Sequence, residues 1–69
     1  MPSSVIRAYS YDAAESRLII EFTSGETYSY FKVPEAVVAG LHQAMSKGRY
    51  FQRHIRDRFD YRRERHRVS

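Results

Sequence analysis

Residues 22–34 read Phe-Thr-Ser-Gly-Glu-Thr-Tyr-Ser-Tyr-Phe-Lys-Val-Pro and combine a turn, a strand and the start of a helix. Gly25 marks a hairpin turn, because glycine adopts positive φ without steric cost. The segment Tyr28-Ser29-Tyr30 alternates aromatic and polar side chains, which is typical of a strand. Pro34 suits the first turn of a helix, where its missing N–H costs nothing. The stretch therefore predicts a β-hairpin followed directly by a helix.

The length of the loop around Gly25 decides which side chains share a face of the sheet. A shift of one residue in the pairing exchanges the two faces. A two-residue loop at residues 24–25 pairs Phe22 with Thr27, whereas a three-residue loop at residues 24–26 pairs Phe22 with Tyr28. We favour the three-residue loop, because it places both tyrosines with the large apolar side chains of the preceding strand.

Two more strands are expected before this hairpin turn. Residues 5–11 are rich in β-branched and aromatic side chains. Simple alternation places Ile6 and Ala8 on one face, and Arg7, Tyr9 and Tyr11 on the other. Residues 17–22 alternate more clearly, with Leu18, Ile20 and Phe22 on one face.

Helices are expected after Pro34. A first apolar stripe at helical spacing consists of Val37, Val38, Leu41, Ala44 and Met45. Ser46 is a candidate cap for a second helix. Its apolar residues, Phe51, Ile55 and Phe59, recur every four positions and predict a helix from about residue 48 to 59.

We therefore predict an α+β domain over residues 3–59, a three-stranded antiparallel meander followed by two helices packed on the sheet. Residues 60–69 have no apolar face and are predicted to be a basic tail, either a frayed helical extension or disordered.

The size and composition exclude several classes of protein. A chain of 69 residues without cysteine has neither disulfides nor thiolate metal sites to reinforce its small core. Self-association is the reinforcement that remains available. No apolar run is long enough to span a membrane, and no secretory signal is visible at the N-terminus. We expect a cytoplasmic protein with no membrane partner.

The charge is concentrated in the C-terminal third. The net charge is +4, but residues 47–69 alone carry nine Lys or Arg against three Asp or Glu. Such an asymmetry is typical of a protein that binds a polyanion or an acidic partner. Residues 1–46 carry a small excess of acidic side chains instead.

Several short motifs occur in a fixed order along the chain: Ser3-Ser4-x-Ile6, Tyr11-Asp12, Leu18-x-x-x-Phe22, Gly25, Tyr28-x-Tyr30, Val33-Pro34 and Ala44-x-Ser46-x-Gly48-x-Tyr50-Phe51. Taken together, they resemble the KTSC domain, which is named for its occurrence at the C-terminus of some lysyl-tRNA synthetases and is also found as small free-standing bacterial proteins. The resemblance implies a domain of unknown molecular function, for which RNA binding has been suggested, and it brings no catalytic residues. Gln52 stands where the family often has asparagine.

The arginines are the strongest indication of function in the sequence. Guanidinium groups bind phosphate oxygens bidentately and also stack on bases. We select as candidate nucleic-acid-binding residues Arg49, Arg53, Arg56, Arg62, Arg63, Tyr28 and Tyr30. The two tyrosines could stack on exposed bases or pack against the helices, and in the second case Tyr9 and Tyr11 could supply exposed rings instead.

No catalytic or cofactor motif accompanies these residues. The three histidines, His42, His54 and His66, are too widely spaced to form a ligand pair within one helical turn. No motif orders a nucleophile, a base and an orienting group, and no glycine-rich phosphate loop is present. We therefore expect no metal, no cofactor and no enzyme activity. The sequence predicts a non-catalytic RNA-binding accessory module, and the alternative is a protein-interaction or homodimer module using the exposed edge of residues 5–11.

Overall fold

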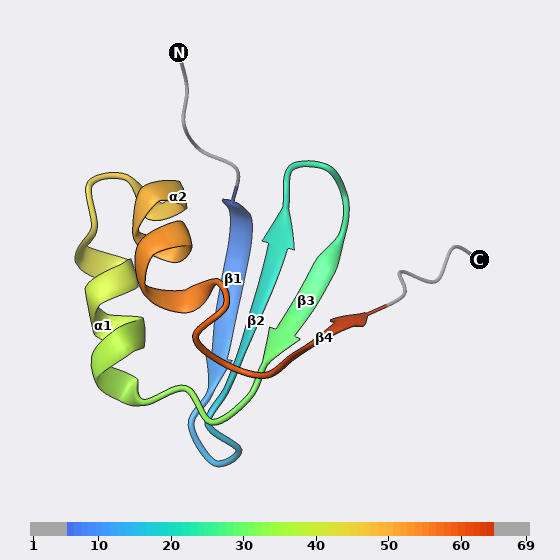
Figure 1. Ribbon diagram of the computed structural model, residues 1–69, viewed down its shortest axis with the longest axis vertical. Coiled ribbons are helices and arrows are strands. Elements are labelled where there is room, and N and C mark those ends of the chain that lie inside the picture. Colours follow the sequence, from blue (N-terminus) through green and yellow to red (C-terminus); the bar gives the residue numbers. More distant parts are fainter. Residues whose placement is uncertain (1–5, 65–69) are drawn as a thin grey trace.

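The computed structural model describes residues 6–64, which form a four-stranded antiparallel sheet with helices over one face (Figure 1). The strands β1 (Ile6–Asp12), β2 (Arg17–Phe22), β3 (Thr27–Tyr30) and β4 (Tyr61–Glu64) are neighbours in chain order. Between β3 and β4 lie α1 (Glu35–Gln43), α2 (Lys47–Tyr50) and the π-helical turn η1 (Phe51–Ile55). The α+β class is confirmed, with three strands before the helices and a fourth after them.

The prediction of three strands was incomplete, because β4 comes from the segment that we expected to be a tail. Tyr30 pairs with Tyr61 and Thr27 pairs with Glu64 in an antiparallel ladder. The Ser29 hydroxyl also donates a hydrogen bond to the Glu64 carboxylate at 2.8 Å. A strand this short and polar has no apolar pattern of its own, and β3 supplies its pairing. Residues 65–69 of the expected tail lie outside the described residues.

The hairpin between β2 and β3 has a three-residue loop, but the loop begins one residue earlier than predicted. The Gly25 N–H donates to the Phe22 carbonyl at 2.9 Å, and the Phe22 N–H donates to the Glu26 carbonyl at 2.8 Å. Tyr28 therefore pairs with Ile20, not with Phe22. The predicted register was wrong by two positions, and the predicted face was right because a shift of two preserves alternation.

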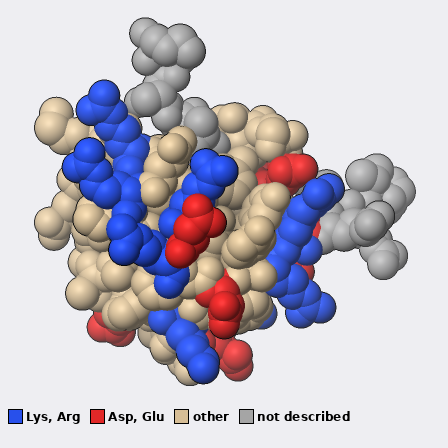
Figure 2. All heavy atoms as spheres, viewed as in Figure 1, with Lys and Arg blue, Asp and Glu red and all other residues tan. Residues whose placement is uncertain are grey.

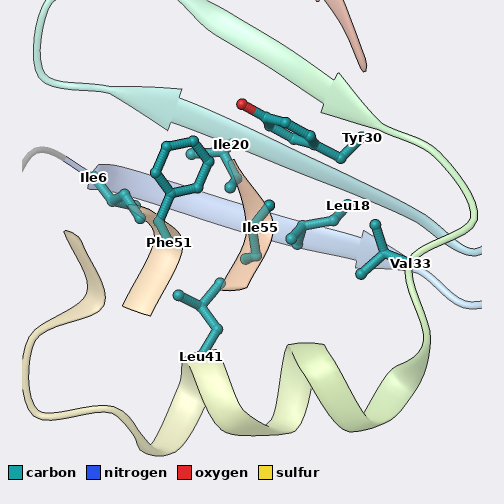
Figure 3. Close-up of a cluster of buried hydrophobic side chains, with 8 residues drawn as sticks. All are labelled: Ile6, Leu18, Ile20, Tyr30, Val33, Leu41, Phe51 and Ile55. Atoms are coloured by element: carbon teal, nitrogen blue, oxygen red, sulfur yellow. The ribbon is translucent and has the colours of Figure 1, made fainter. Parts of the chain in front are cut away.

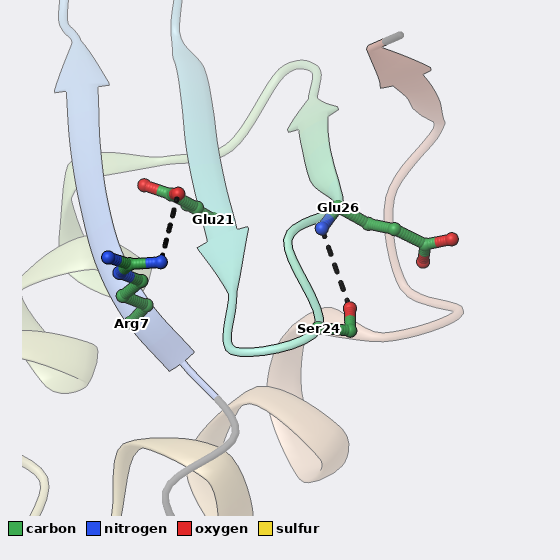
Figure 4. A network of polar contacts seen from close by, with 4 residues as sticks. All are labelled: Arg7, Glu21, Ser24 and Glu26. Atoms are coloured by element: carbon green, nitrogen blue, oxygen red, sulfur yellow. Dashed lines mark hydrogen bonds and ion pairs between the residues drawn. The ribbon is translucent and has the colours of Figure 1, made fainter. Parts of the chain in front are cut away.

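A bulge in β1 overturns the predicted faces of that strand. The register shifts between Ile6 and Ala8, so Ile6 is buried on the same side as Tyr9 and Tyr11. Arg7 sits at the bulge, and its guanidinium lies 4.0 Å from the Glu21 carboxylate (Figure 4). An extra residue of this kind reverses the alternation downstream of it.

The two tyrosines of β1 consequently face the helix side and are not free aromatic surfaces. The Tyr11 hydroxyl donates to the Val33 carbonyl at 2.6 Å. The Tyr9 hydroxyl lies 3.0 Å from Nδ1 of His42 on α1. Both rings are half-buried against the core, so each has only part of its surface free for stacking.

The first helix begins where the sequence predicted and ends earlier than its apolar stripe suggested. Pro34 is the N-terminal cap position, and Glu35 lies in the first turn, where the helix dipole favours a carboxylate. The backbone is extended again at Ala44, so Met45 is fully exposed and does not belong to the stripe. Ser46 caps α2 as predicted, its hydroxyl accepting from the Arg49 N–H at 3.3 Å.

The second helix is also shorter than predicted. It passes into η1, which closes with a bond from the Arg56 N–H to the Phe51 carbonyl at 2.8 Å, and the chain is extended at Arg56. Phe59 therefore packs against the core from the segment after the helix. Asp57, with φ of 64°, lies in the connection that leads from η1 to β4.

The core lies between the helix layer and the covered face of the sheet (Figure 3). Leu18 and Ile20 from β2 are fully buried together with Leu41 from α1 and Ile55 from η1. Val33, in the connection between the layers, is fully buried as well. This cluster fixes η1 over the sheet and thereby positions the residues that follow it.

Candidate functional site

Five aromatic side chains meet on the helix side of β3 and β4. This aromatic cluster consists of Phe22, Tyr28, Tyr30, Phe51 and Tyr61. The Tyr61 ring centroid lies 5.5 Å from that of Tyr28 and 5.6 Å from that of Tyr30. Alternation along β3 and the pairing of Tyr30 with Tyr61 place these three rings on one face. Phe51 reaches them from η1, with its centroid 5.6 Å from that of Tyr30.

An open hollow of about 320 Å³ lies among these rings. All five members of the aromatic cluster line it, and the polar side chains of Glu26, Arg56 and Asp57 complete its walls. In Figure 1 the helices lie on the β1 side of the sheet and leave the β3–β4 side without a helical cover. The hollow is therefore formed where the helix layer stops and η1 turns toward β4.

The polar groups of the hollow differ in how far they are already paired. Glu26 lies 3.6 Å from the Arg63 guanidinium in an exposed ion pair. Within residues 6–64, the side chains of Arg56 and Asp57 make neither a hydrogen bond nor an ion pair. The hollow therefore offers one unpaired guanidinium and one unpaired carboxylate from adjacent residues.

The backbone has an unusual conformation at Asp57, one of the residues that line the hollow. A φ of 64° lies in the left-handed region, which aspartate tolerates better than most residues other than glycine. The Arg58 N–H donates to the Ile55 carbonyl at 3.0 Å and holds the turn closed. The chain reverses here, and β4 then brings Tyr61 to the opposite side of the hollow.

The hydroxyl of Tyr30 is held in its protonated form. Burial raises the pKa of Tyr30 to about 12, the nearby hydroxyls of Tyr28 and Tyr61 act in the same direction, and Arg56 opposes them. Arg56 and Asp57 line the same hollow as Tyr30 and act on its pKa in opposite directions, Arg56 lowering it and Asp57 raising it. Like any tyrosine hydroxyl, this group is protonated at neutral pH and can donate a hydrogen bond, and the raised pKa extends this state to more alkaline pH.

The structure separates the arginines that the sequence grouped together. Arg49 and Arg53 are exposed on α2 and η1. Arg62 and Arg63 are adjacent in β4 and so project from opposite faces, Arg63 beside Tyr28 and Arg62 beside Ser29. Figure 2 shows Lys and Arg in separate groups over the helices and over β4, with Asp and Glu between them. On this face the positive side chains therefore form separate groups, and Arg56 and Arg63 are the candidate arginines nearest the aromatic cluster.

Tyr28 and Tyr30, which the sequence singled out, both line the hollow. Tyr28 is half-buried, but Tyr30 is only 4% exposed and presents little ring surface for stacking. Sequence reasoning placed Phe22 and Phe51 in the core alone and missed Tyr61 and Asp57. No apolar alternation marked the strand that carries Tyr61, and nothing local marked Asp57.

The histidines take structural positions within the described residues. His42 bonds with Tyr9, and the His54 ring centroid lies 4.5 Å from that of Tyr50. Among residues 6–64, no group of three or more His, Cys, Asp or Glu side chains is arranged to hold a metal ion. His66 lies outside that range. No helix in the same range has the length and apolar character needed to cross a bilayer.

This architecture defines a class of small α+β domains in which one antiparallel sheet carries helices on a single face. The chain belongs to the KTSC domain family, whose model matches residues 2–59. A crystal structure of a KTSC domain protein from Yersinia pestis has a TM-score of 0.83 and 36% identity, covering 86% of this chain and 83% of that one. The resemblance seen in the sequence is thus confirmed.

The relatives include both long and short proteins. A lysine–tRNA ligase from Nostoc sp. is 47% identical over 58 residues, which are 84% of this chain and 10% of the ligase. A protein from Tsukamurella paurometabola is 44% identical over 83% of this chain and 85% of its own length. The chain thus spans about a tenth of the length of the ligases that it matches. Strand β4 lies beyond the residues matched by the family model.

Proposed function

We propose that this chain is a non-catalytic accessory module that binds RNA in the cytoplasm. The observation that carries this proposal is the open aromatic hollow with an unpaired arginine at its wall and further exposed arginines on the neighbouring helices. Arginine binds phosphate oxygens, and aromatic side chains stack on unpaired bases. The two kinds of group lie close enough in one small domain to contact the same strand.

The family relationship supports the same proposal. A homologous segment occupies about a tenth of the lysine–tRNA ligases of Nostoc species, enzymes whose name includes an RNA substrate. An accessory domain in such a protein would raise the affinity for RNA without taking part in the reaction. A free-standing copy would keep the binding surface and lack the ligase.

The affinity should come mainly from phosphate contacts and should therefore depend on salt. For a single strand, the logarithm of the binding constant falls by about 0.7 per neutralised phosphate for each tenfold increase in salt. Because phosphate contacts carry no sequence information, arginine substitutions should weaken binding to all sequences alike.

The test is a titration of single-stranded RNA and tRNA at two salt concentrations with the full chain, Arg53→Gln and Arg7→Gln. Both variants lose one positive charge, but Arg7 lies in β1 and is paired with Glu21, whereas Arg53 is exposed on η1. We expect Arg53→Gln to lower both affinity and salt slope, and Arg7→Gln to change them less. Absence of binding at low salt would refute the proposal. Equal losses of affinity for the two variants would show that the RNA-binding surface is not centred on the helices that carry Arg53.

Self-association is a second candidate, which the two outer edges of the sheet favour. β1 and β4 each have one neighbouring strand, so a second chain could pair with either edge. The bulge in β1 makes that edge the less regular of the two. Light scattering over a concentration series tests this candidate, and a constant monomer mass would exclude it.

A further inference from the structure

The hollow has the size and walls of a site for one planar group. Its volume of about 320 Å³ lies at the lower end of the range of about 300–1,000 Å³ that is usual for ligand pockets. Five of the eight residues that line it are aromatic. Tyr61, one of these walls, comes from β4, which lies outside the residues matched by the family model. This wall is therefore supplied by a segment that the family match does not include.

We propose that the hollow binds a single unpaired nucleobase of RNA and prefers a base that carries an exocyclic amino group. This inference rests on the proposed RNA binding and assigns the base-reading site within it. The rings of Tyr28 and Tyr61 supply the stacking surface, because both are more exposed than the ring of Tyr30. Arg56 is placed to contact the phosphate of the bound nucleotide.

The preference for an amino group follows from the unpaired carboxylate of Asp57. An ionised carboxylate only accepts hydrogen bonds, so it favours a base edge that donates an N–H. Adenine, cytosine and guanine each carry an exocyclic amino group, whereas the only N–H donor on the pairing edge of uracil, N3–H, lies between two carbonyl oxygens that an ionised carboxylate repels. A carboxylate accepting from the cytosine amino group is an established mode of base recognition. Asp57 therefore discriminates against uracil, while the rings accept any base.

The charge of Arg56 favours a nucleotide over a quaternary ammonium group, the other kind of ligand that clusters of aromatic rings bind. Rings with neighbouring carboxylates also bind quaternary ammonium groups through cation–π interactions. Here Glu26 is already paired with Arg63, and the guanidinium of Arg56 stands beside Asp57 at the same hollow. A cation would be repelled by Arg56, whereas a nucleotide places its phosphate against this group.

The experiment compares oligonucleotides of A, C and U of equal length on the full chain, Asp57→Asn and Tyr61→Ala. Asparagine also tolerates positive φ, so Asp57→Asn removes the charge without straining the turn. We expect the full chain to bind A or C about five- to tenfold more tightly than U, and Asp57→Asn to lose most of this difference. Tyr61→Ala should weaken all three by about tenfold, because it removes a stacking ring. Arg7→Gln, in β1 at the edge of the sheet far from β4, is the control and should leave the preference unchanged.

A second measurement separates this proposal from RNA binding itself. Millimolar adenosine, cytidine and uridine monophosphates, and tetramethylammonium, are added separately while the amide resonances are followed by NMR. Selective shifts around Tyr28, Asp57 and Tyr61 with the adenosine or cytidine nucleotide support the base site, even if oligonucleotides fail to bind. RNA binding with no effect of Tyr61→Ala and no nucleotide shifts overturns the base site and leaves the proposed function standing. Preferential shifts with tetramethylammonium also overturn it.

Discussion

Gly40 allows Tyr50 to lie directly against α1. A Cβ at residue 40 would lie 2.7 Å from Cζ and 2.8 Å from Cε2 of Tyr50, and closer still to its hydroxyl oxygen. That hydroxyl donates to the Val37 carbonyl at 2.9 Å, which fixes the ring in place. We predict that Gly40→Ala destabilises the fold by about 1–2 kcal/mol, because crowding of about 1–3 kcal/mol exceeds the gain in helix propensity. Urea denaturation measures the change.

The background Tyr50→Leu provides the control for this prediction. Leucine removes the hydroxyl and ring atoms that the added methyl group would meet. In this background Gly40→Ala should stabilise the helix by up to about 1 kcal/mol, since alanine is the better helix former. If the substitution destabilises both backgrounds equally, the Tyr50 contact is not the reason for the glycine.

Tyr30 makes the stability of the fold sensitive to alkaline pH. Burial raises its pKa to about 12 from the ordinary value of 10.0, so the folded state holds this proton more tightly than the unfolded state. The corresponding stability is complete below pH 10 and is lost as the pH rises toward 12. A shift of this size corresponds to about 2–3 kcal/mol. Denaturant unfolding at a series of alkaline pH values measures the loss.

Tyr30→Phe is the matched variant for this titration, because it keeps the buried ring and removes the ionisable group. Its free energy of unfolding should fall less steeply between pH 10 and pH 12 than that of the unsubstituted chain. The other tyrosines are unchanged in the variant and contribute equally to both curves. Parallel curves would mean that another group controls the alkaline transition.

At the scale of elements, the β2–β3 hairpin depends on the backbone of Gly25. Its φ of 98° is unfavourable for an L-residue with a side chain, although no atom lies within 4 Å of where a Cβ would be placed. We predict that Gly25→Ala destabilises the domain by about 1–2 kcal/mol through backbone strain alone. Thermal unfolding monitored by circular dichroism tests this value.

Chemical synthesis of this short chain allows a stricter test of the same turn. D-alanine adds the same methyl group and favours positive φ, so it should be neutral or stabilising at residue 25. Loss of stability with both enantiomers would show that the methyl group itself is harmful. Ser24→Ala is a control of smaller expected effect, because Ser24 Oγ accepts only a 3.5 Å hydrogen bond from Glu26 N–H (Figure 4).

Local chemistry accounts for the elements that the sequence predicted well. Pro34 and Ser46 begin helices through their own backbone and side-chain properties, and the alternation of Leu18 with Ile20 marks a buried strand. The bulge at Arg7 and the first residue of the hairpin loop depend on how strands fit one another. A sequence read strand by strand contains no direct signal for either, so it gave the wrong face for β1 and the wrong register for β3.

In the candidate site, too, some residues could be predicted from local sequence and others depend on long-range packing. Tyr28 and Tyr30 were identifiable, because aromatic residues alternate along one strand. Asp57 and Tyr61 reach the hollow only because η1 ends at Ile55 and the chain reverses toward β3. The spacing of Phe51, Ile55 and Phe59 suggested a longer helix, which would have carried both residues elsewhere. Long-range packing of Ile55 therefore decides the composition of the site.

At the scale of the whole molecule, β4 protects an edge of the sheet. Without it, β3 would be the outer strand, and its backbone groups would be available to another chain. The Tyr61 ring would also leave the rings of Tyr28 and Tyr30, exposing apolar surface beside that edge. Loss of β4 would therefore both open the hollow and favour association of the chain with another copy.

We predict that deletion of residues 61–69 lowers stability by about 1–3 kcal/mol, the sum expected for four lost cross-strand pairs. The shortened chain keeps Asp60, whose carbonyl accepts from the Phe31 N–H at 2.9 Å, and should retain its helices and first three strands. Because the edge of β3 is then open, its mean mass should rise with concentration more steeply than that of the full chain. Deletion of residues 65–69 alone is the control that separates the contribution of β4 from that of the residues after it. Light scattering measures the mean mass of the three chains, and denaturation measures their free energy of unfolding. If the chain without residues 61–69 matches the full chain in both quantities, β4 does not protect the edge of β3.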